Sequence, residues 1–210
     1  MARPALRRVA RPDGAVQPRL AHLDRDRSLV EAAQRDPAAF DTLYRKYLPQ
    51  VYSYAVYELG DHHDAEDATE RTFLAALGAL PAFEERARPE DGHGASTFRV
   101  WLFQIARNEV AQRRRARRRL PDTGLELLLA QAADPVDVEG DAVRRDEAAS
   151  AWRAIARMRG DRRRALILRF VDELTTAEIA GVLGRSEGAV RVLIHRALRD
   201  VADDLGPDRR

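Results

Sequence analysis

Apolar residues recur along this chain with the period of an α-helix, and helix start and stop signals separate the recurring stretches. One series has i, i+3, i+4, i+7 spacing and consists of Phe40, Leu43, Tyr44 and Tyr47. Asp36 and Pro37 fit the cap and first position of a helix ahead of this series, and Gly60 fits a helix end behind it. This pattern predicts an all-α fold.

Three further helices are expected in the first half of the chain. Ser28 and Glu31 have the spacing of a capping box, which predicts a helix start. A second helix is expected from Asp64 to about Leu80, with its acidic residues in the first turns, where the helix dipole favours negative charge. Ser96 is placed to cap a third, long helix that begins at Thr97.

The chain divides by composition into four segments. Residues 1–24 mix Arg and Pro without an apolar period, which predicts a basic disordered arm. Helical patterns occupy residues 25–119 and 147–206. Residues 120–146 are acidic and contain Pro and Gly, so we expect a linker with one short helix at Leu125–Ala130. The predicted architecture is two small helical domains joined by a flexible acidic linker.

Charge is strongly segregated along the chain, although the formal net charge is only +2. Residues 99–119 carry +7 and residues 153–169 carry +6, whereas residues 58–70 and residues 122–147 each carry −6. Alternating blocks of this kind indicate a polyanionic partner and at least one protein partner.

The composition also excludes several classes of protein. The 210 residues include no cysteine, which excludes disulfide scaffolds, thiolate metal sites and cysteine nucleophiles. The longest apolar run, Phe73 to Leu77, is far shorter than the ~18 residues of a membrane-spanning helix. We therefore expect no membrane insertion and a cytoplasmic location.

The second helical unit has the spacing of a helix-turn-helix motif. Thr175 and Glu178 form a capping box at the start of its first helix. The small Ala180 allows two helices to approach closely, and Gly184 permits the left-handed turn between them. Ser186 is placed to cap the second helix.

The second helix of this motif has an apolar stripe and a basic outer face. The stripe consists of Val190, Leu193, Ile194 and Ala197. The outer face consists of Gly188, Arg191, His195 and Arg199, with Arg196 at its edge. A recognition helix uses such a face to read the DNA major groove. An ordinary helical hairpin with solvated arginines is the alternative.

The long helix of the first unit carries Arg99, Phe103 and Arg107 at i, i+4, i+8. We expect these residues to form a solvent-facing row that continues into the segment QRRRARRR, and Trp101 to face the core. Arginines that follow phosphates, beside an aromatic ring for stacking, suit a distorted or single-stranded nucleic acid. A solvated basic helix is the alternative.

Together, these features resemble bacterial RNA polymerase sigma factors of the extracytoplasmic-function (ECF) group, over about residues 26–203. Residues 64–77 resemble the family's region 2.2, residues 98–119 resemble regions 2.3 and 2.4, and residues 162–198 resemble region 4. The short linker in place of a region 3 domain is typical of this group. The chain departs from the group in a longer loop from Phe83 to Phe98.

The resemblance implies three sets of contact residues. The set for the minus 10 promoter element is Phe83, Arg99, Phe103, Arg107, Asn108, Arg113, Arg114, Arg115, Arg117 and Arg118. The set for the minus 35 element is Arg185, Ser186, Glu187, Gly188, Arg191, His195, Arg196 and Arg199. The set for the β′ clamp helices of core RNA polymerase is Asp64, Glu66, Asp67 and Glu70.

Within the first set, the resemblance implies that Asn108 contacts a flipped base and that Phe83 begins the loop that helps to form its pocket. It implies as partners core RNA polymerase, including its β flap, promoter DNA, and an anti-sigma factor such as many relatives have. It implies no catalytic residue, no cofactor and no metal. Val192 and Leu193 stand where many members carry Ser and Arg, which leaves the minus 35 sequence open.

Two other functions are consistent with parts of the sequence. A LuxR-type duplex-binding regulator would share the helix-turn-helix motif, but its sensing domain would not need the basic helix at residues 99–119. A metal-dependent hydrolase is suggested by His62, His63 and Asp64, but adjacent residues on a helix diverge by ~100° and do not easily share one ion.

Overall fold

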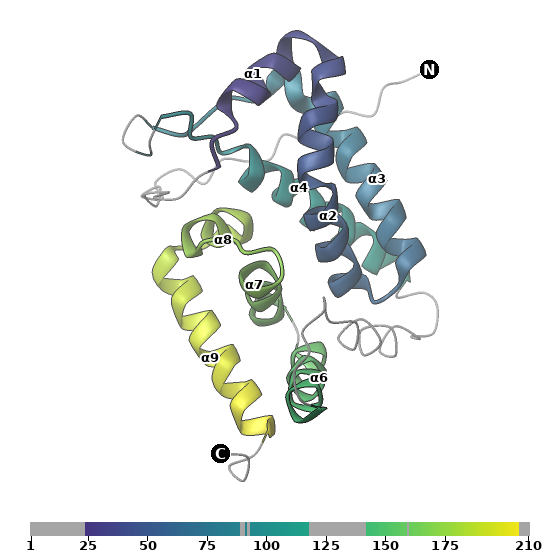
Figure 1. Ribbon diagram of the computed structural model, residues 1–210, viewed down its shortest axis with the longest axis vertical. Helices are drawn as coiled ribbons and strands as arrows, with labels where there is room; N and C mark the ends of the chain where they lie inside the picture. Colours follow the sequence, from purple (N-terminus) through teal and green to yellow (C-terminus); the bar gives the residue numbers. More distant parts are fainter. Residues whose placement is uncertain (1–23, 89–90, 92, 118–141, 159, 206–210) are drawn as a thin grey trace.

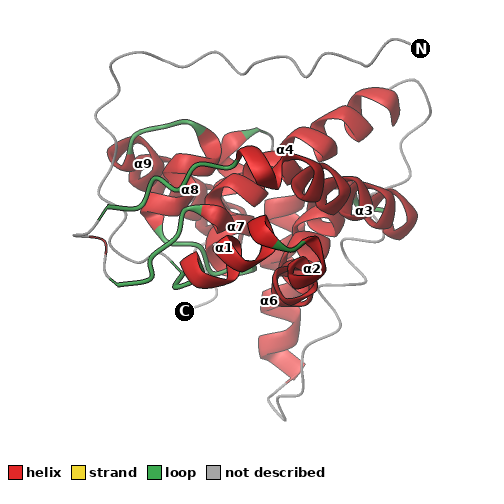
Figure 2. Cartoon of the chain, turned by 90° about the horizontal axis from the view of Figure 1, so that it is seen from above, coloured by secondary structure: helices red, strands yellow, loops and turns green. Residues whose placement is uncertain are grey.

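The computed structural model describes residues 24–88, 91, 93–117, 142–158 and 160–205, and these residues form helices and loops without any strand (Figure 2). The all-α prediction is therefore confirmed. The α-helices are α1 (Arg27–Arg35), α2 (Phe40–Leu59), α3 (His62–Ala79), α4 (Phe98–Arg117), α6 (Ala142–Arg157), α7 (Asp161–Phe170), α8 (Thr176–Leu183) and α9 (Glu187–Leu205). Two short 3₁₀ helices, Pro37–Ala39 and Leu80–Ala82, precede α2 and follow α3.

Part of the predicted organisation lies outside the described residues. This part comprises the arm up to residue 23, the short helix at Leu125–Ala130, and the linker from residue 120 to residue 141. The last residues assigned to the linker belong to α6, which begins at Ala142.

Three of the predicted helix boundaries are confirmed by their hydrogen bonds. The Asp36 carboxylate accepts from the amide of Ala38 at 3.0 Å. Gly60 ends α2 in the left-handed conformation, with φ of 66°, and its amide donates to a carbonyl one turn back. Thr175 and Glu178 form both hydrogen bonds of the capping box that begins α8.

The predicted capping box at Ser28 and Glu31 is wrong. Helix α1 begins at Arg27, and its cap residue Asp26 makes no side-chain capping bond. The Asp26 carboxylate is buried and instead accepts hydrogen bonds from Tyr47 and from the ammonium of Lys46, the latter at 2.7 Å. Helix α3 also begins earlier than expected, because Asp61 caps it by accepting from the amide of Asp64.

The first unit is built on α2, α3 and α4, which pack against one another (Figure 1). Their inward faces bury the side chains Leu43, Tyr47, Val51, Tyr54, Phe73, Phe98, Leu102, Phe103 and Ala106. The rings of Tyr54 and Phe103 meet edge to face, with centroids 5.8 Å apart. Trp101 is half-buried against this cluster, so its expected core position is confirmed only in part.

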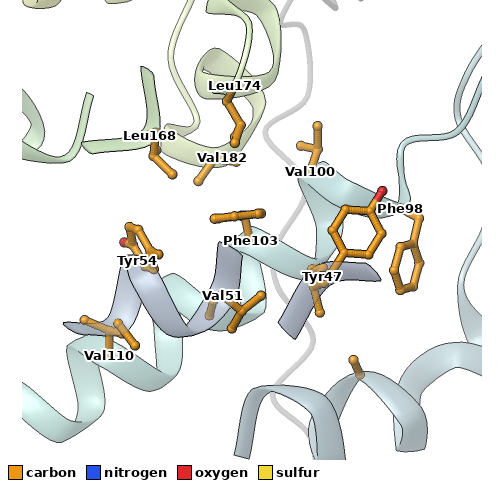
Figure 3. Close-up of a cluster of buried hydrophobic side chains, with 14 of the residues drawn as sticks. Tyr47, Val51, Tyr54, Phe98, Val100, Phe103, Val110, Leu168, Leu174 and Val182 are labelled. Carbon is orange, nitrogen blue, oxygen red and sulfur yellow. The ribbon is translucent and has the colours of Figure 1, made fainter. Parts of the chain in front are cut away.

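The second unit consists of α6 to α9, and part of its core is continuous with that of the first unit. Ala154, Leu166, Ala197 and Val201 form a separate buried cluster within the second unit. One cluster of buried side chains includes Phe103 of α4 together with Leu168, Leu174 and Val182 of the second unit. Figure 3 shows these three side chains on one side of the Phe103 ring and those of α2 on the other. Helix α8 packs on α4, and α7 packs on α2. The two units therefore share an apolar interface.

Candidate nucleic-acid interface

The turn of the helix-turn-helix motif has the geometry that its spacing predicted. Gly184 follows α8 with φ of 65°, a left-handed conformation in which other residues are strained. The amides of Gly184 and Arg185 both donate to the carbonyl of Ala180, which closes the end of α8. Ser186 then caps α9 by accepting from the amide of Ala189 at 3.2 Å.

Helix α9 turns its apolar stripe inward and its basic face to solvent, as predicted. Val190 and Ala197 are buried, and Leu193 and Ile194 are half-buried. The exposed residues of the predicted outer face are Gly188, Arg191, His195, Arg196 and Arg199. The protein thus presents a basic helix face of the kind that enters a major groove.

Three other members of the minus 35 set lie at the start of α9 or just before it. The guanidinium of Arg185 binds the Asp161 carboxylate at 2.6 Å. Burial raises the pKa of Asp161, but the charges of Arg185 and neighbouring arginines outweigh burial. The pKa of Asp161 therefore lies below its ordinary value. Glu187 pairs with Arg191 at 3.2 Å, one helical turn apart. Ser186, whose hydroxyl makes the capping hydrogen bond of α9, is exposed.

The predicted solvent-facing row on α4 is wrong. Phe103 has no exposed surface, Arg99 is 8% exposed, and Arg107 is half-buried. Period 3.6 does place these residues on one face of α4, but that face meets α7 and α8 of the second unit rather than water. The sequence did not show this arrangement, because the contacts join residues more than 70 positions apart.

The polar side chains of this α4 face donate to main-chain carbonyls of the second unit. The Arg107 guanidinium donates to the carbonyl of Val182 at 3.0 Å, and the Gln104 amide donates to that of Gly181 at 2.8 Å. The Arg99 guanidinium donates to the carbonyl of Asp172. Gly181 and Val182 lie in the last turn of α8, where carbonyls have no partner within the helix and carry partial negative charge.

Two buried carboxyl groups accompany Arg99 at this interface. Arg99 lies 3.6 Å from the carboxylate of Glu178, and the Asp172 carboxyl is buried with no hydrogen-bond partner for either oxygen. Burial raises the pKa of Asp172 to about 8, and the charge of Arg99 only partly opposes this shift. The pKa of Glu178 is raised for the same reason. Sequence analysis did not assign these acids to an interface.

Other described members of the minus 10 set lie farther along α4. Asn108 and Arg115 are exposed. Arg114 binds the buried carboxylate of Glu58 at 2.9 Å. The side chain of Arg117, and Arg118 as a whole, lie outside the described residues.

Arg113 links the predicted minus 10 set to the predicted polymerase-binding set. Its guanidinium binds Asp64 at 2.6 Å and Asp67 at 3.0 Å, and the hydrogen bond that it donates to the Asp64 carboxylate is the main reason that the pKa of Arg113 is raised. Glu66 and Glu70, which lie on α3 with Asp64 and Asp67, are exposed. The acidic face of α3 therefore divides into two residues that anchor α4 and two that face solvent.

Phe83 lies half-buried in an aromatic cluster at the start of α4. Its ring centroid is 5.1 Å from that of Trp101 and 6.0 Å from that of Phe98. Phe83 and Trp101 are therefore the half-buried rings of this cluster, whereas Phe98 is buried.

The loop between Phe83 and α4 is held by polar contacts that sequence analysis missed. One oxygen of Glu85 accepts from the amides of Arg86, Ala87 and Thr97. Burial raises the pKa of Glu85, but hydrogen bonds from Ser96 and from this loop outweigh burial and bring the pKa below its ordinary value. A Glu and a Thr twelve positions apart in a loop give no periodic pattern, so no sequence rule indicated this pairing.

The described residues contain no group of three or more His, Asp or Glu side chains arranged to hold a metal ion. His62, one of the residues considered for a metal site, has its Nδ1 atom 2.8 Å from the hydroxyl of Tyr52. None of the helices in the described ranges is both long and apolar enough to cross a membrane.

Comparison with known families identifies both units. The profile described as Sigma-70 region 2 matches residues 43–120, and that described as Sigma-70, region 4 matches residues 149–201.

Among curated proteins, the chain is 36% identical over 184 residues to the ECF RNA polymerase sigma factor BldN of Streptomyces coelicolor, covering 87% of this chain and 66% of that protein. It is 33% identical over 198 residues to the RNA polymerase sigma-H factor of Pseudomonas aeruginosa, covering 88% of this chain and 95% of that protein. It is 31% identical over 182 residues to the ECF sigma factor SigC of Mycobacterium tuberculosis, covering 85% and 90% respectively.

Solved structures with similar folds include two complexes. CnrH bound to the cytosolic domain of CnrY superposes with a TM-score of 0.59 at 25% identity, over 88% of this chain and 99% of that one. The sigma factor RpoE bound to the anti-sigma factor NepR from Bartonella quintana superposes with a TM-score of 0.55 at 21% identity, over 81% of this chain and 98% of that one. This second likeness supports the fold. These findings support a sigma factor and not a LuxR-type regulator: the chain belongs to the ECF RNA polymerase sigma factors.

Proposed function

We propose that the protein binds core RNA polymerase through α3, recognises the minus 10 element through α4 and the minus 35 element through α9, and so directs transcription of a specific regulon. The observation that carries this proposal is the exposed basic face of α9, placed by the turn at Gly184. Catalysis belongs to the polymerase, and the protein acts in the cytoplasm.

The roles within this scheme follow from exposure and charge. Arg191, His195 and Arg196 contact base edges and phosphates of the minus 35 duplex, because they lie on the solvent face of α9. Glu66 and Glu70 face the β′ clamp helices, because their carboxylates are exposed and a basic protein surface complements them.

The minus 10 roles concern DNA melting. Extruding a base costs a few kcal/mol, so a protein that holds the flipped base and the phosphates beside it favours the open state without a fuel molecule. Asn108 is exposed and has both a donor and an acceptor for a base edge. Arg115 is exposed one to two turns farther along the same helix, in reach of a phosphate backbone.

An anti-sigma factor and the polymerase β flap are the further partners that we propose. Support for the first comes from RpoE, which has a similar fold and was solved in complex with the anti-sigma factor NepR.

Transcription of a genomic fragment library by bacterial core polymerase tests the proposal, with and without the purified protein, by mapping RNA 5′ ends. New starts that share two upstream motifs, near minus 10 and minus 35, are the expected result. The Arg191→Ala variant serves as an internal control, since its starts should share an altered upstream motif and the same minus 10 motif. Absence of new starts, together with duplex binding by the protein alone, would overturn the proposal in favour of a conventional regulator.

A further inference from the structure

The loop that leads from α3 to α4 is held together by a carboxylate within it. We call residues 83–88 its outgoing limb and residues 93–97 its returning limb. One oxygen of Glu85 accepts from the amide of Ala87 in the outgoing limb at 2.9 Å. The same oxygen accepts from the amide and from the hydroxyl of Thr97 in the returning limb, both at 2.8 Å. Because one acceptor serves both limbs, Glu85 joins the two ends of the loop.

Helix α1 supplies a second link between the same limbs. Its first residue, Arg27, donates from the guanidinium to the carbonyl of Ala87 at 3.0 Å and to that of Ala95 at 3.2 Å. The Arg27 amide also donates to the carbonyl of Gly94 at 3.2 Å. A guanidinium has several donors in one plane, so a single side chain can hold carbonyls of both limbs. These contacts connect α1, to which the sequence assigned no function, with the loop.

Gln34, two turns farther along α1, fixes the start of the outgoing limb. Its side-chain amide donates to the carbonyl of Leu80 at 3.1 Å and to that of Phe83 at 2.8 Å. These two carbonyls lie at the two ends of the short 3₁₀ helix that precedes the loop. The bond to Phe83 therefore sets the position of the residue whose ring centroid lies 5.1 Å from that of Trp101.

The start of α1 is in turn anchored to the core of the first unit. The buried carboxylate of Asp26 accepts from the ammonium of Lys46 at 2.7 Å and from the hydroxyl of Tyr47, both in α2. The carbonyl of Asp24 accepts from the amide of Ser96 in the returning limb at 2.9 Å. Hydrogen bonds therefore connect α2, the start of α1 and the loop.

The aromatic pair that these contacts hold lies on the face of α4 that also carries Asn108. Trp101 and Asn108 are seven positions apart, which separates them by about 20° around the helix and about 10 Å along it. Trp101 is half-buried beside Phe83, and Asn108 is exposed. One side of α4 thus presents two aromatic rings at one end and an amide two turns away.

We propose that Glu85, Arg27 and Gln34 are positioning residues. They hold Phe83 beside Trp101, so that the pocket for the flipped minus 10 base exists before DNA arrives. This inference rests on the proposed function, which places a flipped base on this face of α4. A loop that is free to move loses conformational entropy when it closes on a ligand, and holding it in the bound arrangement removes that cost. The three residues act on the base through Phe83 and not by contact with it.

Tryptic cleavage after Arg86 tests the links in the full chain without polymerase. Arg86 is exposed in the outgoing limb and is followed by Ala87. The cleavage rate follows the population of the opened loop when opening is fast. Arg27→Ala leaves the sequence around this bond unchanged and should speed the appearance of peptides that begin at Ala87 by about tenfold. Arg35→Ala, at an exposed position in the same helix, is the matched control. Equal rates in these variants and the unaltered protein would overturn the proposal.

Promoter opening tests the role itself, on a promoter found in the genomic-fragment assay. Glu85→Ala and, as a milder change, Gln34→Ala should each lower permanganate reactivity at the minus 10 element by about tenfold. Their starts should share a minus 10 motif with weaker base preference and an unaltered minus 35 motif, and binding to core polymerase should be unchanged. Glu85→Gln keeps an oxygen that accepts the same amides and should restore opening. Glu84→Ala, at the exposed neighbouring position, is the control.

Two results would overturn the positioning role and leave the proposed function standing. One is unchanged opening with an unchanged minus 10 motif in both Glu85→Ala and Gln34→Ala. The other is an equal loss of opening and of polymerase binding, because this would show general damage to the fold. If the unaltered protein gave no new starts at all, the proposed function would have failed, and the positioning role with it.

Discussion

Arg107 in α4 donates a guanidinium hydrogen bond to the main-chain carbonyl of Val182 in α8, with N and O 3.0 Å apart, although the two residues are 75 positions apart in the sequence. This bond and its neighbour from Gln104 join the second unit to the first beside the apolar interface that the two units share. They also turn a basic helix face, which by sequence alone looks like an open nucleic-acid surface, into an internal interface.

Asn108→Ala should lower promoter opening while leaving binding to core polymerase nearly unchanged. The side chain is exposed, so its loss costs little folding stability, but the held base would lose its hydrogen bonds. Permanganate reactivity of unpaired thymines measures opening, and a core-polymerase pull-down measures binding. Gln112→Ala, at an exposed position one turn along α4, is the control. Equal loss of opening and polymerase binding would contradict the assigned role.

Arg191→Ala should relax sequence preference at one position of the minus 35 element, by about 1 to 3 kcal/mol. The guanidinium is exposed, and its pair with Glu187 at 3.2 Å is a surface ion pair of little strength, so it is available to a base edge. Binding measured over a library of minus 35 variants reports the change. Asp203→Ala, exposed near the end of the same helix, should leave the preference intact. A uniform loss over all sequences would instead indicate a phosphate contact.

Charge reversal at Glu66 and Glu70 should weaken binding to core polymerase by about tenfold or more, because both carboxylates are exposed and unlike charges steer association. The double variant Glu66→Lys/Glu70→Lys and the control Glu31→Lys, exposed in α1, can be compared by titrating labelled protein with core polymerase. The loss should shrink as salt is raised. A loss of the same size in the control would attribute the effect to net charge and not to this face.

Asp172→Asn should stabilise the protein at pH 8.5 by about 1 to 3 kcal/mol and have little effect at pH 4. The carboxyl has a pKa of about 8 when folded against an ordinary value of 3.8, so between these pH values the folded chain holds a proton that the unfolded chain has lost. Stability therefore falls as pH rises through this window. Urea unfolding across pH gives the measurement.

The variant Glu173→Gln, at the exposed neighbouring position, is the control for this pH dependence. Its unfolding curves should keep the slope of the unaltered protein between pH 4 and pH 8.5. If Asp172→Asn also kept that slope, the buried carboxyl would not be the source of the dependence.

Local patterns in the sequence determined the helices and the motif. Helix period, the capping residues Asp36 and Thr175, and the left-handed glycines Gly60 and Gly184 each act within a few residues of the chain, so their outcome can be read from neighbours in sequence. The core and outer faces of α9 followed for the same reason. A local prediction failed at Ser28, where α1 begins at Arg27, ahead of the predicted cap, and distant residues, Tyr47 and Lys46, bind the carboxylate of the cap residue Asp26.

Only the tertiary structure decided which faces meet one another. Helix period places Arg99, Phe103 and Arg107 on one face, but it does not show whether that face meets water or another domain. Either environment accommodates the arginines, but only packing against another domain buries the phenylalanine. The same holds for Arg113 in α4, which binds Asp64 and Asp67 in the first turns of α3. The sequence by itself determined the elements and the family's motifs, and the packing of the two units decided which of the basic residues are free to meet DNA.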